Sequence, residues 1–124
     1  MKQLLIIAVL LTRLTALCAQ SKIEKTMNVK DSSFSKTITL EIKQGTQKID
    51  WSAQGFISQG SLSLIAFDPE GKREGGFGLE ASGNQEPGKG KMTHVTKMPL
   101  AGTWKFLLEL NHVTGNLYYL IKID

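Results

Sequence analysis

The chain has 124 residues, a formal net charge of +4 and a single cysteine. A chain of this length can form one domain that is held together by its own hydrophobic core. The basic residues are scattered along the sequence without a run, and a solvated surface explains them better than a track for phosphates. Charge and composition therefore argue against a nucleic-acid-binding protein.

The N-terminus has the three parts of a secretory signal peptide. Lys2 precedes a short apolar run over residues 4–11, and small residues follow up to Ala19. The run is too short to span a bilayer. We expect a signal peptide over residues 1–19, cleavage after Ala19, and a single domain over residues 20–124 that is periplasmic or secreted from a bacterium.

Cys18 leaves an alternative open, because a cysteine at this place can carry the lipid of a bacterial lipoprotein. The bulky Leu17 before it fits such a site poorly. A lipid on Cys18 would tether the domain to a membrane of the cell envelope. Cleavage after Ala19 would instead leave no cysteine and therefore no disulfide. It would also remove Lys2 and Arg13, so that 13 basic and 11 acidic residues leave a net charge of +2.

The first half of the mature chain alternates apolar and polar residues, which is the pattern of half-buried β-strands. Residues 22–29 form a weak first segment, and residues 34–43 follow a turn cluster at residues 31–33. Residues 47–53 resume the alternation, so a hairpin with the preceding segment is expected. Residues 61–67 are apolar on both sides at their C-terminal end, which predicts a strand in the middle of a sheet.

Turn residues and glycines dominate the middle of the chain. Residues 68–71, Asp-Pro-Glu-Gly, predict a β-turn, because proline presets φ at the second position and glycine tolerates the exit geometry. A calcium loop would need more oxygen ligands at fixed spacing. Residues 75–81 predict a glycine-weakened edge strand, and residues 83–90 predict a long loop without either phosphate-binding glycine motif. Such loops are often where binding surfaces lie.

The C-terminal part predicts one further strand and a closing hairpin. Residues 92–97 alternate without a clear apolar side, and Pro99 ends them. Residues 103–110 and 117–123 alternate again on either side of a polar connection. These two segments predict the strands of the hairpin.

No stretch has apolar residues at helical spacing over the length that a helix needs, so we expect no helix in the mature domain. Seven or eight short strands with turns between them predict an all-β chain, folded as an antiparallel, jelly-roll-like β-sandwich. The apolar sides of the strands define the expected core. It comprises Phe34, Ile38, Leu40, Ile42, Ile49, Trp51, Leu62, Leu64, Phe106, Leu108, Tyr119 and Ile121.

Two segments resemble parts of a known type of domain. Residues 60–71 end a strand in the Asp-Pro-Glu-Gly turn, and residues 99–110 open a strand with Gly-Thr-Trp. Both are similar to segments of bacterial pre-peptidase C-terminal domains and of the related convertase P-domains. The resemblance implies a jelly-roll accessory domain without catalytic activity.

The residues give little support to catalysis. His94 and His112 are the only histidines, and a hydrolase would need one of them within hydrogen-bond reach of a serine in a cleft. No Gly-x-Ser-x-Gly motif occurs. Two histidines without a third ligand at suitable spacing make a poor zinc site. We therefore expect no enzyme and no metal or other cofactor, with a small hydrolase as the remote alternative.

The remaining interpretation is a binding or accessory module of the cell envelope, whose partner is a protein or a glycan. Aromatic side chains would supply a platform, and Phe77, Trp104 and Tyr118 are the candidate ligand-binding residues. The alternation puts Trp104 on an apolar side, which favours core packing, and Tyr118 on the outer side. A carbohydrate-binding module is the favoured alternative if the three are exposed and coplanar.

Overall fold

The structure is a computed structural model that describes residues 21–81 and 86–124. It contains five antiparallel strands, and the all-β class is confirmed. They are β1 (Ser21–Ile42), β2 (Lys48–Phe67), β3 (Arg73–Ala81), β4 (Gly88–Lys97) and β5 (Gly102–Ile123). The predicted signal peptide and Cys18 lie outside the described residues and stay predictions. Within the described ranges, no helix has the length and apolarity to cross a membrane.

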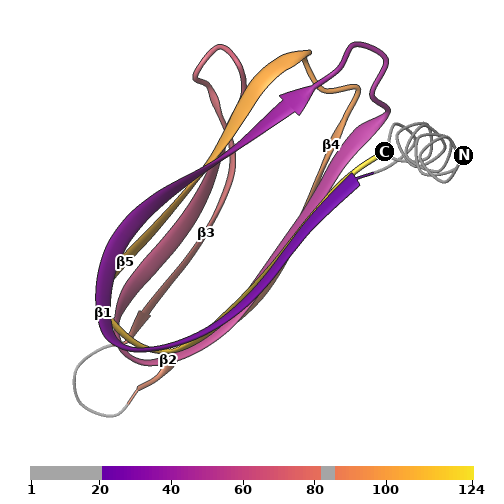
Figure 1. Cartoon of the computed structure of the whole chain (residues 1–124). Helices are drawn as coiled ribbons and strands as arrows, with labels where there is room; N and C mark the ends of the chain where they lie inside the picture. The colour runs from indigo at the N-terminus through magenta and orange to yellow at the C-terminus, as the bar shows by residue number, and fades with distance from the viewer. Residues whose placement is uncertain (1–20, 82–85) are drawn as a thin grey trace, which may run out of the picture.

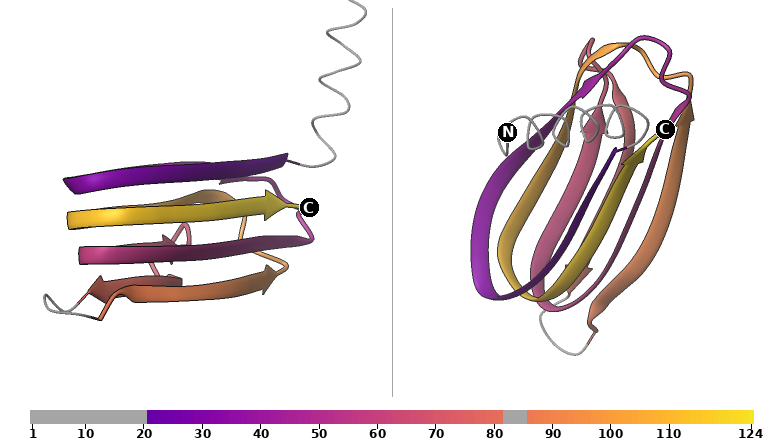
Figure 2. Two further views of the ribbon diagram at one scale, coloured as in Figure 1. Left: turned by 90° about the horizontal axis from the view of Figure 1, so that it is seen from below. Right: turned by 45° about the vertical axis from the view of Figure 1, so that its right-hand side comes forward.

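The three long strands run through both layers of a sandwich (Figure 1). β5 lies between β1 and β2, while β2 pairs with β4 through its first half and with β3 through its second half. The β4 layer consists of β4 with residues 21–29, 48–57 and 115–123. The β3 layer consists of β3 with residues 32–42, 61–67 and 102–111. Figure 2 shows β1, β5 and β2 side by side as they turn from one layer into the other.

The prediction of seven or eight strands was wrong in number, because each long strand supplies two of the predicted segments. Residues 22–29 and 34–43 are both in β1, and residues 103–110 and 117–123 are both in β5. The predicted closing hairpin is therefore one bent strand. The predicted hairpin between β1 and β2 is also absent from the described residues, because β5 lies between these strands. The mid-sheet position of residues 61–67 is confirmed, since they lie between β5 and β3.

The bend is built from residues with left-handed backbone conformations in all three long strands. The φ angle is 44° at Asp31, 86° at Gly60 and 52° at His112, next to irregularities in the strand register. Bulges of this kind bend a strand and increase its twist. A β-carbon on Gly60 would lie 2.3 Å from the carbonyl oxygen of His112, so only glycine fits there.

Side chains replace the backbone ladder where β1 and β5 bulge apart. The backbone N–H of Asp31 donates to Oγ1 of Thr114 at 2.9 Å, and the N–H of His112 donates to Oγ of Ser33 at 2.9 Å. The Asp31 carboxylate lies 3.1 Å from Nδ1 of His112. The turn cluster that the sequence predicted at residues 31–33 is thus part of the bend, and its polar groups satisfy the backbone there.

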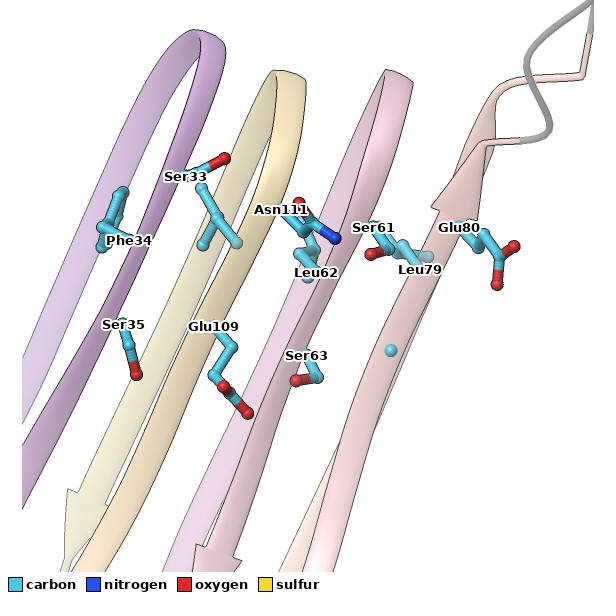
Figure 3. A pocket seen from close by; sticks show the side chains of 12 residues that line it. Ser33, Phe34, Ser35, Ser61, Leu62, Ser63, Leu79, Glu80, Glu109 and Asn111 are labelled. Carbon is cyan, nitrogen blue, oxygen red and sulfur yellow. The ribbon is translucent and has the colours of Figure 1, made fainter.

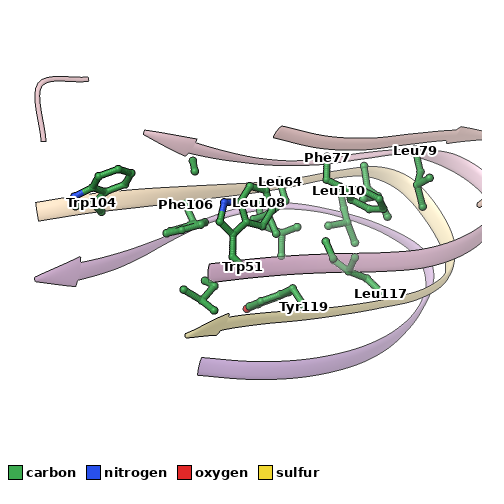
Figure 4. Packing of buried hydrophobic residues seen from close by; sticks show 14 of the residues in the cluster. Trp51, Leu64, Phe77, Leu79, Trp104, Phe106, Leu108, Leu110, Leu117 and Tyr119 are labelled. Carbon is green, nitrogen blue, oxygen red and sulfur yellow. The ribbon is translucent and has the colours of Figure 1, made fainter. Parts of the chain in front are cut away.

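The core fills the space between the two layers (Figure 4). Trp51 from the β4 layer meets Phe106 from the β3 layer edge to face, with ring centroids 5.4 Å apart and an interplanar angle of 88°. Most of the predicted core is buried, but Phe34 is 38% exposed and Ile38 is only partly buried. The reason is that β1 is the edge strand of both layers, so no further strand covers these side chains.

The two segments that carried the family resemblance lie next to each other. The predicted turn at residues 68–71 is confirmed, because the N–H of Gly71 donates to the carbonyl oxygen of Asp68 at 2.9 Å. A β-carbon on Gly102 would lie 2.9 Å from Cβ of Pro69, so the start of β5 packs against this turn. Nε1 of Trp104 donates to the carbonyl oxygen of Leu100 at 2.8 Å.

The predicted edge strand over residues 75–81 is confirmed as part of β3, but the loop predicted after it differs. β4 begins at Gly88, so the predicted loop over residues 83–90 is shorter than expected, and residues 83–85 lie outside the described residues. The side chains of Met92 and His94 face inward, which settles the side that the sequence left open. The centroids of the His94 and Trp51 rings are 6.2 Å apart. Gly75 on β3 has these two rings beside it, so the missing side chain makes room for them.

Candidate functional site

A groove of about 870 Å³ crosses the outer face of the β3 layer (Figure 3). Four strands line it. The residues at the outward positions of these strands are polar, apart from one glycine. These are Ser33 and Ser35 of β1, Glu109 and Asn111 of β5, Ser61 and Ser63 of β2, and Gly78 and Glu80 of β3. Phe34, Leu62, Leu79 and Leu110 alternate with them, and the three leucines are buried in the core. The groove is therefore the polar side of strands whose other side builds the core.

The strand register arranges the outward residues in two rows. In one row, Glu109 of β5 lies opposite Ser35 on one side and Ser63 on the other. In the second row, Ser61 of β2 lies opposite Asn111 on one side and Glu80 on the other. Figure 3 shows both rows crossing the ribbons side by side. Hydroxyls, an amide and two carboxylates thus point from rigid strands into one open space.

Small residues create the hollow. Gly78 lies opposite Ser63, and a β-carbon built on it would have only the carbonyl oxygen of Leu62 nearby, at 3.6 Å. The side chains of Glu80 and Glu109 rise on either side of this low point and are exposed. The depth of the groove therefore depends on Gly78 of the edge strand β3 and on the serines of the neighbouring strand β2.

The outer face of the β4 layer holds a second, smaller hollow of about 570 Å³. Gln54 and Phe56 of β2, Lys89 and Lys91 of β4 and Asn116 of β5 line it, together with two glycines. Phe56 is 45% exposed. This face carries aromatic and basic side chains, in contrast to the serines and glutamates of the groove.

Tyr118 lies on this second face, as the alternation predicted, opposite Gln54. Its hydroxyl donates a hydrogen bond of 2.6 Å to Oε2 of Glu24. This bond raises the pKa of Tyr118 above the ordinary 10.0, and desolvation and the charge of Glu24 raise it further. The neighbouring Tyr119 is buried, and burial raises its pKa as well.

The three predicted ligand-binding aromatics do not form one platform. Trp104 is 2% exposed and Phe77 is 8% exposed, and both are part of the core. Each faces inward because its strand has buried residues on that side and solvent on the other. Only Tyr118 is on an outer face, so the condition set for a carbohydrate-binding platform, that Phe77, Trp104 and Tyr118 are exposed and coplanar, is not met.

The histidines do not form the arrangement that a serine hydrolase needs. The ring of His94 packs near Trp51, and the ring of His112 contacts Asp31. Ser33 does contact His112, but its Oγ accepts from the backbone N–H and not from the imidazole. In the part of the chain that the structure describes, neither imidazole has a serine as hydrogen-bond partner.

The described residues contain no group of three or more His, Cys, Asp or Glu side chains that could hold a metal ion. Asp68, the residue that suggested calcium, is 5% exposed. Its Oδ1 accepts from the backbone N–H groups of Glu70 and Lys72, at 2.9 Å each. The Asp68 carboxylate therefore stabilises the backbone of the turn.

Sequence reasoning missed every outward residue of the groove. In the segments 34–43, 61–67 and 103–110, the alternation identified the polar residues as lying on the solvent-facing side of a strand. Which of them share one face depends on the register between strands far apart in sequence, and alternation within a strand does not reveal that. The small residues at positions 61, 63 and 78 were the available signal, since a hollow needs small side chains on neighbouring strands.

No protein-family model matches the chain, and no curated protein matches it significantly in sequence. The predicted resemblance to pre-peptidase C-terminal domains therefore stays a prediction. Among solved structures, the chain is similar to a carbohydrate-binding module of Cellvibrio mixtus lichenase 5A in complex with cellotriose. Identity is 18%, 85% of this chain and 88% of that chain are covered, and the TM-score is 0.43.

Two further solved structures show the range of the similarity. The module TmCBM61, in complex with β-1,4-galactotriose, is 14% identical, with 85% of this chain and 87% of that chain covered and a TM-score of 0.42. The lipase BlEst2 of Bacillus licheniformis is 16% identical, with 82% of this chain but only 21% of that chain covered and a TM-score of 0.46. These similarities concern the β-sandwich architecture alone.

Proposed function

We propose that this protein is an exported, non-catalytic module that binds a glycan of the cell envelope through the groove of the β3 layer. The observation that carries the proposal is the groove itself. Two rows of hydrogen-bonding side chains project from four paired strands into one open space of about 870 Å³. That size is within the range of ligand-binding clefts.

The chemistry of the lining suits sugar hydroxyls. A hydroxyl both donates and accepts hydrogen bonds, so it needs partners of both kinds. The carboxylates of Glu80 and Glu109 accept, the amide of Asn111 does both, and the serine hydroxyls rotate to do either. Because these groups stand on paired strands, little order has to be imposed on them when a ligand binds.

The groove fits peptide recognition less well. An extended peptide binds by adding a strand to a free sheet edge, and a helical peptide needs an apolar groove. The floor of this groove is formed by β5 and β2, whose backbones are already paired on both sides. Its outward side chains are polar, so neither mode of recognition is available there.

The glutamates are placed for binding. Glu80 and Glu109 lie on opposite sides of β2 and in different rows, so two strand spacings and two residues along the strand put their backbones about 12 Å apart. Burial is what tunes a carboxyl group for general acid catalysis, and both side chains are exposed. These features favour two independent hydrogen-bond acceptors over an acid–base pair.

Export rests on the predicted signal peptide over residues 1–19, and the lipoprotein alternative at Cys18 is kept. Either outcome would bring the groove to the envelope, where glycans are abundant. The intact mass of the protein from its native host distinguishes the two. A chain that starts at Gln20 supports a free module, whereas a lipid mass on Cys18 supports a tethered one.

The binding proposal is tested by filling the groove. Gly78→Val places a side chain at its low point, in open space and on an edge strand that tolerates a β-branched residue. Ser52→Val, which makes the same kind of change at a small outward residue of the central strand β2 in the β4 layer, is the control. Both are compared with the unmodified protein on an array of neutral oligosaccharides from β-glucans, galactans and xylans, together with oligomers of N-acetylglucosamine, the neutral sugar of peptidoglycan.

We expect at least one neutral oligosaccharide to be retained by the unmodified protein and by Ser52→Val. Gly78→Val should weaken its binding by about tenfold or more, because about 1.4 kcal/mol is lost when a polar contact is blocked. Retention of no oligosaccharide, or equal retention by Gly78→Val, would contradict the proposal. Circular dichroism and thermal unfolding establish that both variants are folded.

A further inference from the structure

The two outer faces of the sandwich differ in charge, and the difference points to a second ligand. On the β4 layer, the outward positions carry six lysines: Lys22, Lys48, Lys89, Lys91, Lys97 and Lys122. The acidic residues on this side are Glu24, Asp50 and the terminal Asp124. Nζ of Lys22 lies 3.8 Å from Oε1 of Glu24, and Nζ of Lys48 lies 3.8 Å from Oδ2 of Asp124, so each of these lysines forms an ion pair. We call this surface the lysine face.

Four of the six lysines form no ion pair among the described residues: Lys89 and Lys91 at one end of the face, and Lys97 and Lys122 at the other. Lys89 and Lys91 are exposed and point from β4 beside the hollow described above. Across residues 21–81 and 86–124, no carboxylate forms an ion pair with either of them. An anion bound there would therefore gain two charge partners without displacing an existing ion pair.

Aromatic and amide groups lie beside these two lysines. Phe56 is opposite both Lys89 and Asn116, and Gln54 is opposite both Lys91 and Tyr118. Phe56 and Tyr118 are thus diagonal neighbours on adjacent strands, about 7 Å apart. The hydrogen bond from Tyr118 to Glu24 fixes the position of its hydroxyl. The hollow combines a charged side, two amides and an apolar ring surface.

We infer that the lysine face binds an acidic glycan, with Phe56, Lys89 and Lys91 as its principal contacts. A uronate unit matches this combination of groups. Its carboxylate pairs with the lysines, its hydroxyls bond the amides of Gln54 and Asn116, and the apolar face of its ring packs on Phe56. This site lies on the opposite side of the sandwich from the groove and does not rest on glycan binding there.

The distribution of charge favours an acidic glycan over a nucleic acid. Phosphates follow each other closely along a nucleic acid and require a continuous basic track. Glu24 and Asp50 lie among the lysines and interrupt such a track. A glycan whose carboxylates are separated by neutral hydroxyl-bearing units tolerates this interruption.

The test compares acidic polymers with their own neutral forms. Affinity electrophoresis is run in gels that contain polygalacturonate, alginate or hyaluronate, each beside the same polymer with its carboxylates reduced to alcohols. We expect at least one acidic polymer to retard the protein and its reduced form to have little effect. Retardation should decline as sodium chloride is added, because exposed charges are screened.

Variants assign the binding to this face. Lys89→Gln with Lys91→Gln should weaken binding about tenfold, whereas Lys36→Gln with Lys105→Gln, which removes the same charge elsewhere, should change it less than twofold. Phe56→Ala should weaken binding about fivefold, and Val95→Ala, an exposed residue at the other end of the same face, should have little effect.

Three results would overturn the inference. They are the absence of retardation by all three acidic polymers, equal loss in the two lysine pairs, and tighter binding of a twelve-residue oligothymidylate than of any acidic polymer. The groove-filling variant Gly78→Val should keep full binding to the acidic polymer. Failure of this site and failure of the proposed function are therefore separate outcomes.

Discussion

The two outer faces of this sandwich are built from the same three strands, yet they present opposite chemistry. β1, β2 and β5 contribute to both layers. In its groove the β3 layer exposes serines, Asn111 and two glutamates, while the β4 layer exposes lysines, Phe56 and Tyr118. The bend in each long strand separates the two sets. One continuous strand can therefore serve two surfaces, provided that a bulge divides it.

The bend is the feature that both faces depend on, so breaking it should have the largest effect. Gly60→Ala places a methyl group 2.3 Å from the carbonyl oxygen of His112 and also strains a backbone at φ 86°. We expect the free energy of unfolding to fall by about 3 kcal/mol or more. Urea denaturation followed by tryptophan fluorescence measures it.

Gly45→Ala is the matched control for this prediction. Its φ is 92°, but a β-carbon there has no atom within 4 Å. Only the backbone strain remains, so the loss should be about 1 kcal/mol. Equal losses in the two variants would show that close packing at the bend does not matter.

The turn after β2 supports the β3 layer alone. Asp68→Ala removes an acceptor from two backbone N–H groups in a buried place and should cost about 2 kcal/mol. Asp68→Asn keeps an acceptor oxygen and should cost less. Hydrogen exchange should accelerate in β3 more than in β4; uniform acceleration would contradict the view that this turn serves one layer.

Salt should distinguish the two faces. Binding of an acidic glycan at the lysine face should weaken about tenfold between 50 and 500 mM sodium chloride, since the lysines are exposed. Binding of a neutral glycan in the groove should change less than twofold, because the ligand has no charge. Calorimetric titration at the two salt concentrations tests this, and an equal response of both ligands would remove the distinction.

The smallest expected effect concerns the ionisation of Tyr118. Tyr118 and Tyr119 are the only tyrosines, so Tyr119→Phe leaves one phenol to titrate by its absorbance near 295 nm. We expect a midpoint above 10.0, because the hydrogen bond to Glu24 favours the neutral phenol. Glu24→Gln in the same background should move the midpoint toward 10.0, and an unchanged midpoint would contradict the assigned cause.

The same pKa shift has a defined effect on stability. In the unfolded chain, the phenol ionises near its ordinary pKa of 10.0, and in the folded protein it ionises at higher pH. The stabilisation from this group is therefore complete below pH 10 and is lost as the pH rises through the folded-state pKa. Unfolding by urea at several alkaline pH values follows this loss.

Alternation along the chain predicted the fold class and most of the core, and the Asp-Pro-Glu-Gly segment predicted the turn at Asp68. It failed where local patterns have two physical explanations. The polar residues around Asp31 and His112 are equally compatible with a turn and with a bend inside a strand, and only pairing with β5 and β2 decides between them. The expected closing hairpin arose from this ambiguity.

The candidate sites were less predictable because they depend on register. Ser63 and Gly78 meet only when β2 and β3 pair, and Glu109 joins them through β5. Phe77 and Trp104 misled the search for a platform, since an aromatic residue on a strand serves a core or a surface equally well. Their burial follows from which side of each strand faces the opposite layer.

A titration of the ¹⁵N-labelled protein with a retained neutral oligosaccharide, followed through the backbone amide resonances, tests the central claim most directly. We predict that the largest shifts occur at residues of the groove, among them Ser61, Ser63, Gly78 and Asn111, while Gln54, Lys91 and Tyr118 on the opposite face stay unchanged. Shifts confined to the lysine face, or spread evenly over both faces, would contradict the assignment of the groove as the glycan-binding site.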